Sequence, residues 1–107
     1  MIDSFFFDFD GTLQGFDNHE ISDSTIEALK LLKQKNKKIY IATGRNMVDM
    51  PEHIFDYGFD GYINNNGAMC SDSDRKQFFV EYINPKDIDA LLRYDDENPF
   101  AFTYMTQ

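Results

Sequence analysis

Two carboxylates that follow an aromatic run are the residues of this chain best placed to do chemistry. The run at positions 5–7 leads into Asp8 and Asp10, and Gly11 allows a sharp turn directly after them. An apolar run that ends in a turn signal predicts a strand buried on both faces, here over residues 2–9. Side chains two apart on a strand leave from the same side. Both acids should therefore meet at the strand's carboxyl end, where ligands bind in open α/β sheets.

A second polar turn follows a second predicted strand. Residues 38–42 are apolar enough for a strand, and Thr43, Gly44 and Arg45 come directly after it. A helix predicted between the two strands makes a right-handed crossover, which sets the strands parallel and brings Thr43 to the same sheet edge as Asp8. Two questions stay open from the residues alone. Thr43 can equally cap a helix, and Arg45 either grips phosphate in a bidentate manner or pairs with an acidic residue.

The stretches D-F-D-G-T-L and I-A-T-G-R resemble the first and second motifs of the haloacid-dehalogenase (HAD) superfamily of phosphohydrolases. The arginine after the glycine resembles the second motif of the Cof-type subgroup, the sugar-phosphate and related phosphatases. The stretch at 66–68 resembles the N-G-A segment of the same subgroup. Asn66 there either lines the substrate cavity or only supplies turn geometry with Gly67. The resemblance implies an α/β fold. This is a partial HAD-like Rossmannoid core, a parallel sheet with flanking helices, followed by a β-hairpin and the start of an α+β cap.

The resemblance also implies a role for each polar residue at this edge. Asp8 would attack phosphorus and form an aspartyl-phosphate, while Asp10 would protonate the leaving oxygen and then activate water. That second role requires a raised pKa for Asp10. Thr43 and Gly44 would donate to the phosphoryl oxygens, with Arg45 as a further phosphate-binding residue. Mg²⁺ would bind the Asp8 carboxylate and the Asp10 main-chain carbonyl.

The charge balance of the chain excludes some partners and calls for others. Ten basic against nineteen acidic residues give a formal net charge of −9, which argues against a nucleic-acid or anionic-membrane surface. A phosphate site built on Asp8 and Asp10 would need a hard divalent cation to neutralise the acids. The only cysteine, Cys70, excludes an internal disulfide. With no signal peptide or long apolar span visible, we expect a cytoplasmic protein.

The length of 107 residues and the hydrophobic share of 42% fit one modest globular domain. The other expected elements have clear start and stop signals. They are a helix capped within 22–24 with a stripe of Thr25, Ala28, Leu29 and Leu32, a helix from 49 to Gly58, a strand at 59–63, a hairpin of 68–70 and 77–83 about a turn at 71–76, a helix from Asn84 to Pro99, and a strand at 100–105.

The family pattern divides the chain into two parts, 1–83 as the start of the catalytic core and 84–107 as the beginning of an inserted cap. HAD phosphatases also use a later lysine and a later acidic motif, for which the Asp95-Asp96 pair in the cap helix is no substitute. We therefore expect an N-terminal fragment of a longer enzyme, whose first strand has neighbours on one edge only. Dimerisation or strand exchange through this uncovered edge is the alternative.

The function that the resemblance implies is Mg²⁺-dependent hydrolysis of small phosphorylated metabolites such as sugar phosphates. Two other classes stay open. A non-catalytic binding or assembly module would keep the fold and bind Mg²⁺ without turnover. A phosphoryl transferase or mutase of the same superfamily would pass the phosphate to a hydroxyl group and release no free phosphate.

Overall fold

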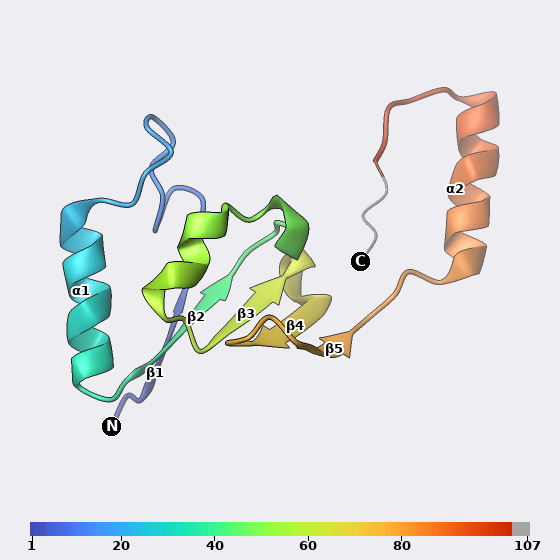
Figure 1. Ribbon diagram of the computed structural model, residues 1–107. Coiled ribbons are helices and arrows are strands. Elements are labelled where there is room, and N and C mark those ends of the chain that lie inside the picture. Colours follow the sequence, from blue (N-terminus) through green and yellow to red (C-terminus); the bar gives the residue numbers. More distant parts are fainter. Residues whose placement is uncertain (104–107) are drawn as a thin grey trace.

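A five-stranded mixed sheet forms the centre of the computed structural model, which describes residues 1–103 (Figure 1). The strands lie side by side in chain order: β1 (Ser4–Phe7), β2 (Lys38–Ala42), β3 (Gly61–Asn64), β4 (Met69–Asp72) and β5 (Gln77–Val80). The first three strands are parallel, and β4 and β5 continue the sheet in antiparallel pairs. The predicted α/β class is confirmed, as are the hairpin and the parallel crossover.

Two α-helices and three short 3₁₀-helices accompany the sheet in the described residues. They are α1 (Asp23–Gln34), η1 (Met47–Asp49), η2 (Glu52–Tyr57), η3 (Asn65–Gly67) and α2 (Pro85–Glu97). The single helix predicted from residue 49 to Gly58 is wrong, because η1 and η2 stand in its place. The break lies at Met50 and Pro51, both extended with ψ of 135° and 133°, since a residue before proline is disfavoured in the helical region. Gly58 does end η2, with φ of +76°.

The core lies between one face of the sheet and the helices α1 and η2. Ser22 caps α1 by accepting the Thr25 N–H, and the chain leaves the helix through Asn36 at φ of +57°. The cap is therefore Ser22, the first of the predicted candidates. The stripe includes Ile26 instead of Ala28, which is exposed. The largest fully buried apolar side chains of this core are Phe9, Ile39, Ile41, Ile54, Phe59 and Tyr62.

The first strand is an edge strand with one open face. β1 pairs with β2 on one side, and within residues 1–103 no strand pairs with its other side. Phe6 is 59% exposed and stacks on Tyr40 at a ring-centroid distance of 4.8 Å. The prediction of an uncovered edge is thus confirmed. The prediction that the aromatic run is buried on both faces is wrong, because only Phe5 and Phe7 turn toward the core.

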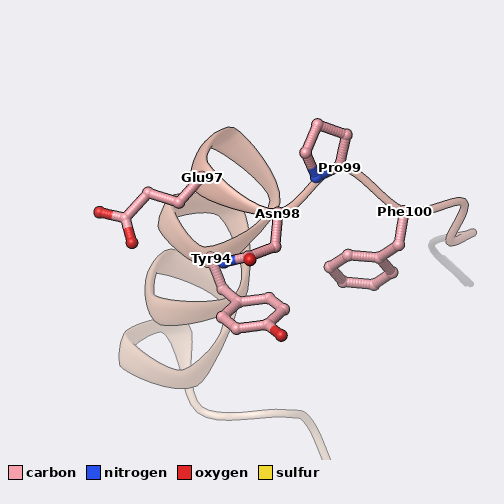
Figure 2. A pocket seen from close by; sticks show the side chains of 5 residues that line it. All are labelled: Tyr94, Glu97, Asn98, Pro99 and Phe100. Carbon is pink, nitrogen blue, oxygen red and sulfur yellow. The ribbon is translucent and has the colours of Figure 1, made fainter.

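The helix α2 stands apart from the sheet (Figure 1). None of its residues is buried, and the radius of gyration of 17.0 Å exceeds the roughly 13 Å of a compact chain of this length. At its carboxyl end the rings of Tyr94 and Phe100 meet edge to face at 5.9 Å and border a shallow hollow (Figure 2). Of the strand predicted at 100–105, residues 100–103 are not strand and the rest lies outside the described residues.

No helix within residues 1–103 has the length and apolar character needed to cross a membrane. The division of the chain at residue 83 stays a prediction.

Asp60 joins the start of β2 to the segment that precedes β3. Its carboxylate accepts the Ile39 N–H at 2.9 Å and lies 3.4 Å from the ammonium groups of Lys33 and Lys38. Burial alone would raise the pKa of Asp60, but the Ile39 N–H and the two ammonium groups outweigh it and lower the pKa. The folded state therefore favours the ionised carboxylate.

Replacing Asp60 by asparagine should lower the free energy of unfolding at pH 7 by about 1.5 kcal/mol, the low end of the usual contribution of a hydrogen bond to a charged group. Because the folded pKa lies below the ordinary 3.8, this contribution is present above that value and is lost as the pH falls through the folded pKa. Urea unfolding at pH 7 and pH 3 should show the difference narrowing in acid. Asp56→Asn, which removes an exposed carboxylate, is the control. An equal loss at both pH values would contradict the ionic role.

Candidate functional site

The two acids of the first motif lie in a tight turn just after β1. The Asp8 carboxylate accepts the Phe9 N–H at 2.8 Å. The Phe9 carbonyl accepts the N–H groups of Thr12 and Gln14 at 3.2 and 3.0 Å, and Gly11 takes φ of +77°. The expectation that both acids sit on one straight strand is therefore wrong. They still lie at the carboxyl end of β1, because the turn begins at Asp8.

Buried side chains hold this turn in place. Phe9 is fully buried and Leu13 is nearly so. Gln14, which the sequence placed in a polar loop, is also buried, and its Oε1 has no hydrogen-bond partner in the described residues. The turn is thus anchored by its own residues, and the carboxylates project from a fixed base.

Arg45 reaches across from the second turn and pairs with Asp10. Its Nη2 and Nε donate to the two carboxylate oxygens at 2.7 and 2.8 Å, a bidentate arrangement. Its Nη1 donates to the Asp49 carbonyl at 3.0 Å, and the guanidinium lies 5.1 Å from the centre of the Phe9 ring. Of the two roles left open for Arg45, the described structure has the pairing with an acid.

This pairing sets the charge of Asp10. The hydrogen bonds from Arg45 lower the pKa of the Asp10 carboxyl below its ordinary value, although burial acts in the opposite direction. The pKa of Arg45 is raised in turn. The expectation of a raised pKa for Asp10 is therefore wrong for this arrangement, because it counted burial and not the guanidinium that the fold brings to the carboxylate.

Thr43 and Gly44 form a turn that is tied to the adjoining strand. Thr43 is buried, its N–H donates to the Ile63 carbonyl at 2.9 Å, and its Oγ1 accepts the Arg45 N–H at 3.1 Å. The reading of Thr43 as a helix cap is not confirmed, since Asn46 caps the next helical segment, η1. The parallel pairing of β1 and β2 brings this turn to the same sheet edge as Asp8, as predicted.

Asn66 lies beside Gly44. Asn65, Asn66 and Gly67 all have left-handed backbone angles, with φ of 51°, 54° and 97°, and the Asn66 N–H donates to the Thr43 carbonyl at 3.1 Å. A Cβ at Gly44 would come within 3.0 Å of the Asn66 Oδ1. Asn66 therefore both forms part of the turn and lies next to the second motif. The absence of a side chain at Gly44 leaves room for the Asn66 amide.

The residues present fit only part of a magnesium site. Asp8 offers an exposed carboxylate, a hard oxygen ligand of the kind Mg²⁺ takes. Both carboxylate oxygens of Asp10 are engaged by Arg45, so Asp10 would contribute its main-chain carbonyl. Within residues 1–103, no three His, Cys, Asp or Glu side chains gather closely enough to hold a metal ion. Mg²⁺ commonly binds through one or two carboxylates with water and substrate phosphate, which is compatible with this partial set.

Two contacts of the site could not be read from the sequence. The Asn64 side-chain amide donates to the Arg45 carbonyl at 3.1 Å, and the Asp49 carbonyl accepts from the Arg45 guanidinium. Asn64 stands in a run of three asparagines, where turn chemistry alone accounts for such residues. A carbonyl acceptor leaves no trace in residue type at all.

Comparisons with known proteins identify relatives of this chain. A family model described as haloacid dehalogenase-like hydrolase matches residues 5–107. The HMP-PP phosphatase of Klebsiella pneumoniae (strain 342) is 30% identical over 87 residues, which are 80% of this chain and 32% of that protein.

Solved structures give the same result. A phosphatase of the haloalkanoate (HAD) superfamily from Bacteroides thetaiotaomicron superposes with a TM-score of 0.82 at 37% identity, over 91% of this chain and 36% of that one. A HAD subclass IIB sugar phosphatase superposes with a TM-score of 0.78 at 36% identity, over 89% of this chain and 37% of that one. The chain thus spans about a third of the length of these relatives.

Replacing Arg45 by glutamine should raise the pKa of Asp10 toward or above its ordinary 3.8, because the hydrogen bonds that lower it are lost while burial remains. Titration of the Asp10 side-chain carboxyl carbon by ¹³C NMR measures this. Arg75→Gln is the matched control, since Arg75 pairs with Glu52 elsewhere on the surface. An unchanged Asp10 pKa in Arg45→Gln would show that the ion pair does not form in solution.

Proposed function

This chain belongs to the haloacid dehalogenase-like hydrolases, and from that premise we propose that its residues form the nucleophile side of a phosphatase site for small phosphorylated metabolites such as sugar phosphates. The observation that supports this most is the pairing of Asp10 with Arg45. It joins the first and second motifs at one sheet edge, with Asp8 exposed in the same turn. A site for phosphoryl transfer needs a nucleophile, a proton donor and phosphate ligands within reach of one another.

Asp8 is proposed as the nucleophile. One oxygen of its carboxylate would form a bond to phosphorus as the ester P–O bond breaks, leaving an aspartyl-phosphate and the freed alcohol. Water then attacks the phosphorus, releases inorganic phosphate and restores the carboxylate. The exposed position of Asp8 and the Phe9 N–H that fixes one of its oxygens support an oriented, accessible nucleophile.

Asp10 is proposed as the acid and base, with Arg45 controlling when it can act. While Arg45 holds both oxygens of Asp10, the carboxyl cannot keep a proton near neutrality. A phosphoryl group entering the site competes for the same guanidinium, because phosphate oxygens accept the bidentate fork as well as carboxylates do. Transfer of Arg45 to the phosphate would raise the pKa of Asp10, which could then protonate the leaving oxygen and later take a proton from water.

Thr43 and Gly44 are proposed to hold the phosphoryl oxygens, and Asn66 to face the substrate. The Thr43 hydroxyl and the Gly44 N–H would donate to charge that develops during transfer. The packing of the Asn66 amide beside Gly44 supports its place at the substrate's side of the turn.

Mg²⁺, bound by the Asp8 carboxylate and the Asp10 carbonyl, would neutralise phosphoryl charge that the acids otherwise repel. The later lysine and acidic motif of the family would complete the set in a protein that contains them. Such a protein would work in a reducing cytoplasm, where Cys70 stays a thiol. Its activity as a whole is part of this proposal.

The test is Mg²⁺-dependent hydrolysis of p-nitrophenyl phosphate by the protein expressed from its whole coding region. Asp8→Asn should reduce the rate to background, because the nucleophile is lost, and Asp10→Asn should reduce kcat at least about a hundredfold. Asp17→Asn, which removes an exposed carboxylate from the loop after the first motif, should leave the rate unchanged.

The other outcomes separate the alternatives. Equal activity of wild type and Asp8→Asn would refute the proposed nucleophile. Mg²⁺ binding with no turnover would favour a binding module. Loss of ester without release of free phosphate, with a sugar added as acceptor, would favour a transferase or mutase.

A further inference from the structure

Four hydrogen bonds tie the turn at 43–45 to the end of β3 and to η3. They run from the Thr43 N–H to the Ile63 carbonyl at 2.9 Å, from the Asn66 N–H to the Thr43 carbonyl at 3.1 Å, and from the Asn65 N–H and the Asn64 side-chain Nδ2 to the Arg45 carbonyl, both at 3.1 Å. Three of these are main-chain bonds that any residue provides. The fourth depends on the identity of residue 64.

The bond from Asn64 acts on the same residue that engages Asp10. The Arg45 carbonyl accepts the Asn64 amide at one end of the residue, and the guanidinium grips Asp10 at the other. An arginine side chain has several rotatable bonds, so its reach depends on a fixed main-chain origin. Fixing the Arg45 carbonyl therefore limits where the guanidinium can lie.

Asn64 occupies its position at a cost that strand formation does not explain. It is completely buried as the last residue of β3, and its Oδ1 has no hydrogen-bond partner within residues 1–103. Burying an unpaired amide oxygen is unfavourable, and a β-branched apolar residue suits a buried strand better. The one described contact that sets asparagine apart from such a residue is the bond to the Arg45 carbonyl.

We propose that Asn64 is a positioning residue for the second motif: its side-chain amide fixes the Arg45 main chain and so holds the Arg45 guanidinium on Asp10. Its importance for phosphoryl chemistry rests on the function proposed above, whereas the positioning itself is a property of this chain. Within residues 1–103 the Asn64 side chain makes no hydrogen bond to Asp8 or Asp10, and it acts through Arg45.

The test follows the Arg45 Nε–H signal by NMR in the 107-residue chain with ¹⁵N-labelled arginine. In Asn64→Leu, whose side chain has the same branching but no donor, exchange of this N–H with solvent should be roughly five- to tenfold faster, as expected when about one net hydrogen bond is lost. The thermal midpoint should stay close to that of the wild type, because the unpaired Oδ1 disappears together with the donor and Asn65 still serves the Arg45 carbonyl.

Ser71→Ala is the matched control. Ser71 is also buried, its Oγ also lacks a partner in the described residues, and it lies on the neighbouring strand β4. Its replacement should leave the Arg45 signal unchanged. The signal of Arg75, which pairs with Glu52, should be the same in all variants.

Wild-type exchange at Arg45 in a folded Asn64→Leu would overturn the proposal. If that variant does not fold, Asn64→Val, a smaller residue suited to a strand, provides the same readout. The phosphatase assay is separate. If Arg45 exchanges faster in Asn64→Leu but the wild type has no phosphatase activity, the positioning role stands and the proposed function is refuted. If exchange is unchanged in Asn64→Leu and the wild type is active, the proposed function stands and the positioning role is refuted.

Discussion

The ion pair between Asp10 and Arg45 is the interaction on which the rest of the candidate site depends. It joins residues 35 positions apart in the chain, with both oxygens of the carboxylate and two nitrogens of the guanidinium engaged. The remaining contacts of Arg45, with the Asp49 carbonyl and the Phe9 ring, leave it little freedom. In a chain with a formal net charge of −9, this guanidinium supplies the cation that pairs with Asp10. An incoming phosphate would have to compete for it.

The parallel strands bring the turn after β1 and the turn after β2 to the same edge of the sheet. Parallel pairing of β1 with β2 sets the ends of these strands side by side, and the pairing of β2 with β3 adds the asparagine turn to the same edge. The core beneath is built from one face of the sheet together with α1 and η2, so the turns are supported by packed elements. The opposite face, with Phe6 exposed, and the detached α2 take no part in placing these residues.

The sequence correctly predicted those elements whose formation depends on residues close together in the chain. The apolar runs correctly predicted the strands of the sheet, Ser22 the start of α1, and Gly58 the end of η2. The crossover rule correctly placed Thr43 at the same sheet edge as Asp8. Burial of the aromatic run on both faces was wrong, because the cover of a second face comes from distant residues. The Asp10 pKa was wrong for the same reason, since Arg45 lies far along the chain. The bond from Asn64 to the Arg45 carbonyl has no sequence signal, because it joins a side chain to a main-chain atom.

Chemical trapping of the phosphorylated residue tests directly whether Asp8 is the nucleophile. The protein is incubated with Mg²⁺ and a phosphate ester, quenched with borohydride, which reduces an acyl phosphate to an alcohol, and digested for mass spectrometry. We expect homoserine at position 8 and an unmodified aspartate at position 10, only when Mg²⁺ and ester are both present. Reduction at Asp10 instead of Asp8, or turnover of the ester with no reducible residue in the first motif, would rule out Asp8 as the nucleophile.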